Sequence, residues 1–276
     1  MNASCGVDSP FQRSKRNLGR ANVFLRRQEY LKAVEAAQKA FGLKALCGSL
    51  IGKQKIELEF LFLDFCDKFN NDPGIINFLD SIKIRFRPFL AYKPGQEQQM
   101  VTKLNIVGER MIAKERERTK RKELEAANKK RDLLDKGQQS LDKGEFPRGK
   151  SYLRRVADEY GHEPGVLTDI AARLIDKDIL LEAAEILDTA RKKHPKDHTA
   201  YSLSIKAYLG LGDLPKAEGV YKAAISQFGG HPQTYLNLSK LYLRWRKRDK
   251  AFAFAKLALE ADPELMEARD IMRSTG

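Results

Sequence analysis

The stretch Tyr235-Leu-Asn-Leu-Ser-Lys-Leu-Tyr242 decides the fold, because its large apolar residues recur at steps of three and four. This spacing places them on one face of a helix. After the polar break Arg246-Lys-Arg-Asp249, a second helix is predicted over Lys250–Ala258, and Asp262-Pro263 ends it. The small residues of this second helix fall on one stripe: Ala251, Ala255 and Ala258. Another helix can approach this stripe closely, so the sequence predicts a packed helical hairpin.

The hairpin pattern returns at steps of 34 residues towards the N-terminus. In the preceding copy, Tyr201 and Tyr208 mark the first helix, Gly212-Asp213 marks the turn, and Ala217 opens the apolar face of the second helix. Four copies begin near residues 130, 164, 198 and 232, with no insertion between them. Such a period is typical of an all-α solenoid, in which each hairpin buries its apolar face on its neighbours.

Residues 130–265 resemble tetratricopeptide repeats. The last copy carries the closest match to that family's pattern, through Tyr235, Leu238, Tyr242, Ala251, Ala258 and Pro263. It departs from the pattern at Ser239 and Ala255, and the first copy departs at Lys136 and Gly149, where an apolar residue and Ala are usual. The resemblance implies a superhelical solenoid, and residues 266–276 then read as its capping helix.

The N-terminal region, residues 1–95, is predicted to be mainly helical. A looser copy of the hairpin lies at residues 15–41, and an apolar stripe predicts a buried helix over Ser49–Phe69. A short helix is expected over Gly74–Ile82. Alternating residues from Ile82 to Arg87 then favour a short extended stretch, which the flanking prolines make marginal as a strand.

Residues 96–129 predict one long connecting helix whose second half has almost no apolar face. Its segment 114–131 holds nine basic and four acidic residues, and the whole chain carries a net charge of +14. Phosphate contacts are one interpretation of this charge. Interleaved Glu residues and a lack of aromatic residues favour the other interpretation, a solvated helix of mixed charge.

Several short patterns suggest chemistry, but their context does not support it. Gly144-Glu-Phe-Pro-Arg-Gly-Lys150-Ser151 satisfies a phosphate-loop pattern, yet it is preceded by a predicted helix and not by a strand. The histidines occur at junctions between copies, where turn residues are expected: His162, His194, His198 and His231. We expect no catalytic, cofactor-binding or metal-binding residues, and therefore no enzyme.

The cysteines and the hydropathy pattern restrict the cellular setting. Cys5, Cys47 and Cys66 are odd in number and form no C-x-x-C pair, which argues against a disulfide framework and a zinc site. No apolar run approaches the roughly 20 residues that cross a bilayer. No secretory signal is recognised, so a cytoplasmic location is expected.

The resemblance implies that the first helices of successive hairpins line a concave groove. The candidate partner-binding residues mapped onto that groove are Gln138, Thr168, Ser202, Lys206, Asn237, Lys240 and Arg244. This groove is expected to be apolar to neutral at its start and basic at its end, which suits a peptide with acidic residues or a free carboxylate. The sequence therefore predicts a non-enzymatic scaffold or adaptor that binds another protein. The alternative is a nucleic-acid-associated protein that uses residues 83–131 and recruits a partner through its repeats.

Overall fold

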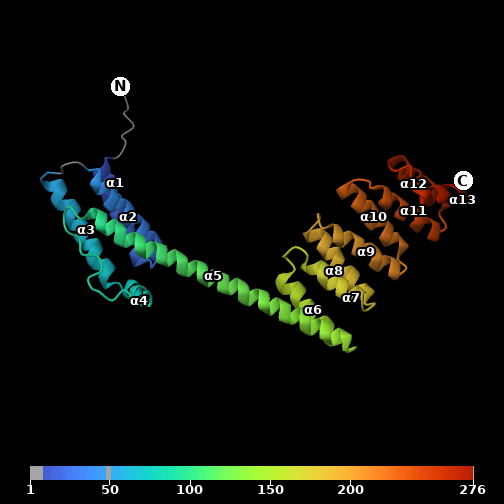
Figure 1. Cartoon of the computed structure of the whole chain (residues 1–276), viewed down its shortest axis with the longest axis horizontal. Helices are drawn as coiled ribbons and strands as arrows, with labels where there is room; N and C mark the ends of the chain where they lie inside the picture. Colours follow the sequence, from blue (N-terminus) through green and yellow to red (C-terminus); the bar gives the residue numbers. More distant parts are fainter. Residues whose placement is uncertain (1–8, 48–50, 276) are drawn as a thin grey trace, which may run out of the picture. The chain divides into compact units, whose positions relative to one another are not determined.

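The computed structural model describes residues 9–47 and 51–275, and within these it contains helices α1 to α13 and no strand. The chain divides into two compact units, Met1–Leu124 and Glu125–Gly276, each with its own apolar core (Figure 1). The all-α prediction is confirmed. Cys5 and the first two residues of the predicted helix Ser49–Phe69 lie outside the described residues.

The N-terminal unit begins with a hairpin of α1 (Pro10–Arg26) and α2 (Tyr30–Ala45). Ser9 starts α1, because its side chain accepts a hydrogen bond from the Gln12 backbone N–H and Pro10 occupies the first helical position. Helix α3 (Lys53–Asn71) packs against α1 and buries one face: Leu58, Phe62, Phe65 and Phe69. Helix α4 (Pro73–Ser81) follows at once, because Asp72 accepts hydrogen bonds from its first turn.

The segment after α4 forms a loop where a marginal strand was predicted. The Asn70 side chain of α3 binds the Leu90 backbone twice, accepting from its N–H at 2.9 Å and donating to its C=O at 2.8 Å. This contact fixes the loop on α3 and buries Phe89 and Leu90, while Phe86 stays 57% exposed. The alternation of apolar and basic residues from Ile82 to Arg87 therefore does not identify the side chains that the loop buries.

Helix α5 runs without a break from Glu97 to Asp142. The predicted connecting helix was expected to end at residue 129, before the first repeat. No glycine or proline occurs between residues 109 and 136, so nothing in this stretch stops the helix, and its last part serves as the first helix of the first repeat. Residues 112–129 are all exposed, in agreement with their polar sequence.

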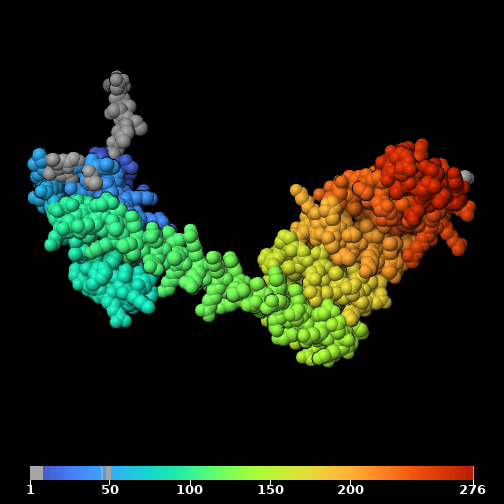
Figure 2. Space-filling model, viewed as in Figure 1, coloured from blue at the N-terminus to red at the C-terminus, as the bar shows by residue number. Residues whose placement is uncertain are grey.

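The C-terminal unit is a succession of hairpins that pack on one another in chain order, yellow to red in Figure 2. Its helices after α5 are α6 (Phe146–Tyr160), α7 (Val166–Ile175), α8 (Leu180–Lys193), α9 (His198–Gly210), α10 (Leu214–Phe228), α11 (Pro232–Arg244), α12 (Arg248–Ala261) and α13 (Met266–Thr275). The predicted alanine stripe of the last hairpin, Ala251, Ala255 and Ala258, is fully buried. Helix α13 covers α12.

One turn geometry recurs inside the hairpins of both units. A residue with positive φ stands between the two helices, and these residues are Gln28, Gly144, Asp178, Gly212 and Arg246. In each case the next N–H bonds to a carbonyl five residues back, as from Glu29 to Phe24 and from Lys247 to Tyr242, both at 2.9 Å. This bond satisfies a carbonyl at the end of the first helix. The hairpin at α1–α2 therefore shares its turn with the C-terminal repeats.

Gly149, which departs from the family pattern, has a packing role. A Cβ atom at this position would lie 3.1 Å from the Gly137 carbonyl oxygen of α5 and 2.6 Å from the Leu141 side chain. A Cβ atom at Gly137 would meet Leu153 of α6 at 2.8 Å. The two glycines therefore let α5 and α6 approach more closely than alanine would allow.

Candidate partner-binding groove

A pocket of about 490 Å³ opens in the C-terminal unit between α9, α10 and α11. Its lining residues come from the first helices of two successive repeats and the second helix between them: His198, Tyr201, Ser202, Ile205, Tyr221, Ala224, Phe228, Gly229, His231, Thr234 and Asn237. Of the candidate partner-binding residues, Ser202 and Asn237 line this pocket.

The floor of this pocket is aromatic. The ring of Phe228 stacks on His198, with ring centroids 3.7 Å apart, and meets the edge of Tyr201 at 5.1 Å. Tyr201 and Tyr221 are buried, each 7% exposed, whereas Phe228 is half-buried. Ligand pockets are typically lined by apolar and aromatic side chains with a few polar groups, and the lining of this pocket has that composition.

The rim of the pocket offers hydrogen-bond donors. Asn237 accepts a bond from Gln233 Nε2 at 3.1 Å through its Oδ1, and its amide NH₂ has no partner within the described part of the chain. His231 Nδ1 accepts from the Gln233 backbone N–H at 3.3 Å, so the proton of the neutral ring belongs on Nε2. Ser202 is exposed beside them, and its hydroxyl donates to the His198 backbone carbonyl at 3.1 Å, which leaves its oxygen as an acceptor. The N–H groups of Asn237 and His231 suit the carbonyl or carboxylate oxygens of a ligand.

Two cationic side chains without an ion pair belong to α9 and α11, the first helices whose residues line the pocket. Lys206, one turn after Ser202 on α9, and Arg244, at the end of α11, are exposed and form no ion pair among residues 9–47 and 51–275. Lys240 differs, because it pairs with Glu267 of α13. The predicted basic end of the groove therefore contains two free cations and one that is already neutralised.

The start of the groove is charged where the sequence analysis expected apolar to neutral groups. Gln138 of α5 accepts from Arg173 at 3.2 Å and donates to Asp142 at 2.9 Å. Lys177 pairs with Asp142 at 2.8 Å. The Thr168 side chain is buried, 6% exposed, and its hydroxyl donates to the Gly165 carbonyl at 2.8 Å. Gln138 and Thr168 are thus occupied in contacts within and between repeats.

Residues 180–232 and 203–265 match the tetratricopeptide repeat family. The chain therefore contains tetratricopeptide repeats over residues 180–265. Its fold resembles that of a number of solved structures, including the following three. The MamA protein is 17% identical and covers 54% of this chain and 81% of its own, with a TM-score of 0.43. A MamA fragment from Desulfovibrio magneticus RS-1 is 18% identical, covers 53% and 89%, and scores 0.40. YrrB, described as a tetratricopeptide repeat protein with an unusual peptide-binding site, is 17% identical, covers 44% and 62%, and scores 0.36. No curated protein matches the sequence.

Several groove residues were not identified from the sequence. Phe228 ends the second helix of its repeat, where the neighbouring repeats carry His194 and Asp262, so the 34-residue period gives no sign of an aromatic residue here. His198 and His231 were interpreted as turn residues, and the structure places both on the pocket wall. Their positions at the first turn of the groove-lining helices were the available signal.

The phosphate-loop pattern has a structural explanation in these repeats. Lys150 of α6 pairs with Glu182 of α8, and this contact lowers the pKa of the Glu182 carboxyl. Lys150 and Ser151 line a furrow of about 770 Å³ whose charges balance, with Lys150, Arg154 and Lys193 against Asp158, Glu182 and Glu185. Because the Lys150 ammonium is already paired with Glu182, the pattern fits an inter-repeat contact better than a nucleotide site.

Other candidate chemistry is not assembled by the described residues. They contain no group of three His, Cys, Asp or Glu side chains placed to hold a metal ion. None of the helices in the described part of the chain is long and apolar enough to cross a membrane. Cys47 and Cys66 are free and buried, and burial raises the pKa of both thiols, which makes them poor nucleophiles.

The basic region of residues 83–131 is partly engaged in internal contacts. Lys103 donates to the Phe89 carbonyl at 2.8 Å, and Lys114 donates to the Ser81 hydroxyl at 2.9 Å. Arg87 pairs with Asp80 at 2.9 Å. The exposed residues 112–129 include no aromatic side chain on which a base could stack. The geometry therefore adds nothing in favour of nucleic-acid binding.

Proposed function

We propose that this protein is a non-enzymatic adaptor that holds an extended segment of a partner protein in the groove between α9, α10 and α11. Tetratricopeptide repeats are protein interaction scaffolds, and the chain contains them over residues 180–265. The observation that carries the finer proposal is the aromatic pocket with hydrogen-bond donors on its rim. We place this function in the cytoplasm, as the sequence analysis expects.

The ligand that suits this groove carries negative charge. Asn237 and His231 present N–H groups on the pocket rim, and Lys206 and Arg244 present unpaired positive charges on the same pair of helices. An acidic side chain or a terminal carboxylate of the partner can satisfy both sets of groups. Charge-assisted hydrogen bonds of this kind are roughly twice as strong as neutral ones.

The test is a capture experiment with the full chain, followed by a peptide titration. Bound partners are identified by mass spectrometry, and an acidic peptide from the captured partner is then titrated by fluorescence anisotropy. The double variant Lys206→Glu, Arg244→Glu should weaken peptide binding at least about tenfold, or about 1.4 kcal/mol. Its melting temperature should remain close to that of the parent, because both side chains are exposed.

The matched control reverses two exposed lysines at the end of α8, Lys192→Glu and Lys193→Glu. It changes net charge equally but leaves the groove intact. If both double variants lose affinity to the same extent, only overall charge matters and the groove proposal is wrong.

A further inference from the structure

Helix α3 carries a second apolar row that the core does not use. Ile56 is 69% exposed, Phe60 is 66% exposed and Leu63 is 52% exposed. Their spacing of four and three residues places them on one side of the helix. The buried Leu58 lies two residues from Phe60, which is about 160° away around the helix. The row therefore faces away from the core of the N-terminal unit.

Opposite charges stand at the two ends of this row. Lys53 lies seven residues before Phe60, and Asp67 lies seven residues after it. Seven residues make almost two helical turns, so each charged residue lies within about 20° of Phe60 around the helix and about 10 Å from it along the axis. Both are exposed, and neither forms an ion pair within the described part of the chain. Asp67 accepts a hydrogen bond from the neutral Asn71 amide at 3.0 Å, which does not neutralise its charge.

The start of α3 has no negative group to stabilise it among its own residues. Gly52, which precedes the first turn, has no side chain for capping, and the first turn contains no acidic residue. Lys53 adds a positive charge where the helix dipole already has its positive end. A carboxylate that arrives from outside the helix would therefore stabilise this end of α3.

We propose that α3 is the contact surface of a homodimer, in which the α3 helices of two copies pack antiparallel across a twofold axis at Phe60. A twofold contact is self-complementary, so a residue before Phe60 faces a residue at a similar distance after it. Ile56 of one copy packs on Leu63 of the other, and the two Phe60 rings meet at the axis. Lys53 of each copy meets Asp67 of the other, which brings a carboxylate to the start of each α3.

The length of this row limits the strength of the dimer. The distance from Lys53 to Asp67 along α3 is about 21 Å, or about four helical turns. One helix face of this size buries less than the roughly 800 Å² per copy of a standard interface, so we expect a weak dimer with a dissociation constant in the micromolar range. Binding energy concentrates in a few large side chains near the centre of an interface, which assigns that role to Phe60.

Other occupants agree less well with this row. A bilayer would have to bury the Asp67 carboxylate beside the apolar side chains, and burying an unpaired charge is costly. A nucleic acid would gain little from the aliphatic Ile56 and Leu63, which cannot stack on bases. A second copy of the chain carries both the apolar row and the two charges in the complementary order.

The test measures self-association of the full chain by sedimentation velocity, from low micromolar to submillimolar concentration. The parent protein should pass from monomer to dimer over this range. Phe60→Ser should weaken the dimer at least about tenfold. Lys53→Asp and Asp67→Lys should each weaken it at least about tenfold too, because each replaces two attractive contacts with two repulsive ones. Circular dichroism of each variant verifies that the helices remain folded.

A charge exchange distinguishes this geometry from non-specific association. An equimolar mixture of Lys53→Asp and Asp67→Lys should form a heterodimer, because each end contact then again joins one lysine and one aspartate. The control is Lys55→Asp, which makes the same charge change at an exposed position about 140° around α3 from Phe60. This control should dimerise like the parent protein.

Three outcomes would overturn the proposal. These are a chain that stays monomeric at all concentrations, a dimer that Phe60→Ser leaves intact, and charge reversals that neither weaken the dimer alone nor associate when mixed. Vesicle binding that Phe60→Ser abolishes, without a dimer in solution, would assign the row to a membrane surface instead. Lys206→Glu with Arg244→Glu should dimerise like the parent protein, so the dimer is tested independently of the groove proposal.

Discussion

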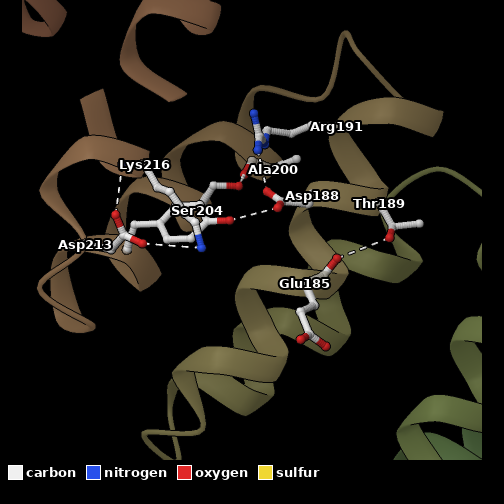
Figure 3. A network of polar contacts seen from close by, with 9 residues as sticks. Glu185, Asp188, Thr189, Arg191, Ala200, Ser204, Asp213 and Lys216 are labelled. Atoms are coloured by element: carbon white, nitrogen blue, oxygen red, sulfur yellow. Dashed lines mark hydrogen bonds and ion pairs between the residues drawn. The ribbon is translucent and has the colours of Figure 1, made fainter. Parts of the chain in front are cut away.

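The Tyr208 hydroxyl of α9 donates a 2.8 Å hydrogen bond to Asp188 Oδ2 of α8 and so connects two successive repeats. Arg191 pairs with the same carboxylate (Figure 3). Lys216 lies over the Tyr208 ring, with its Nζ 5.4 Å from the ring centroid. The next repeat repeats the arrangement, since the Tyr242 hydroxyl donates to Glu218 at 2.6 Å. Each of the last two repeats thus carries a tyrosine that reaches back to a carboxylate of the repeat before it.

Replacing Tyr208 with Phe should destabilise the protein by about 1.5–3 kcal/mol, because the ring remains while one hydrogen bond to a charged group is lost. Urea unfolding followed by circular dichroism measures this change. Tyr242→Phe should give a loss of similar size. An unchanged midpoint in both variants would show that these hydroxyls add nothing to the contact between repeats.

Deprotonation of Tyr208 should lower the stability of the fold at alkaline pH. Burial, followed by the hydrogen bond to Asp188, raises the pKa of Tyr208 to about 12. A folded-state pKa above the unfolded value of about 10 means that its stabilising contribution is complete below pH 10 and is lost as the pH rises towards 12. Melting temperatures measured from pH 9 to 12 should therefore fall less steeply in Tyr208→Phe than in the parent protein. A parallel fall in both proteins would contradict this assignment.

Lys150→Ala should leave folding nearly intact and reveal no nucleotide site. The pair of Lys150 with Glu182 is partly exposed, so its loss should cost no more than about 1 kcal/mol. Isothermal calorimetry with ATP and magnesium should give no heat of binding for either protein. Micromolar ATP binding that disappears in Lys150→Ala would restore the phosphate-loop interpretation.

Arg246→Gly should stabilise the last hairpin. Arg246 occupies the interhelical turn with φ of 58°, a conformation that glycine adopts without the steric cost of a Cβ atom. A gain of about 0.5–1 kcal/mol is expected in thermal or urea unfolding. Lys256→Gly, at an exposed position inside α12, is the control and should lose about 1 kcal/mol. A loss of stability in Arg246→Gly would mean that contacts of the arginine side chain stabilise the fold by more than its positive φ destabilises it.

Lys206→Glu and Lys240→Glu should differ in their effect on peptide binding, although the sequence treats the two positions alike. Lys206 has no ion pair within the described residues, whereas Lys240 is already paired with Glu267. We expect Lys206→Glu to lower the affinity for an acidic peptide at least about fivefold, or about 1 kcal/mol. Lys240→Glu should lower this affinity less. Lys240→Glu should instead lower the melting temperature slightly, since it places two carboxylates together at α13. The reverse order of affinities would contradict the groove geometry.

The fragment Glu125–Gly276 should fold by itself, because its core is made within the unit and α13 covers the last hairpin. Circular dichroism should show a helical spectrum and a cooperative melt. A shorter fragment from residue 146 lacks the end of α5, on which α6 packs through Gly137 and Gly149, and should melt at a lower temperature. A coil-like spectrum of the longer fragment would show that residues before 125 are needed for folding.

The 34-residue period of apolar and small residues, by itself, determined most of the C-terminal fold. Tyr208 and Tyr242, the turn residues and the alanine stripe of the last hairpin are all local patterns, and a helix with such a stripe has only its neighbours on which to bury it. The same local signals predicted α1, α2 and α4 and the apolar face of α3.

Only the tertiary structure decided which groove residues are free. Thr168 and Ser202 occupy the same position in successive repeats, yet the first is buried and the second is exposed. Lys240 is neutralised by Glu267, and Phe228 enters the pocket from a second helix. Contacts between residues far apart in the chain depend on how neighbouring hairpins pack, and a one-dimensional period does not encode side-chain partners. The apolar row of α3 belongs to this class, because only the packing of its other face on the core shows that Ile56, Phe60 and Leu63 are left exposed.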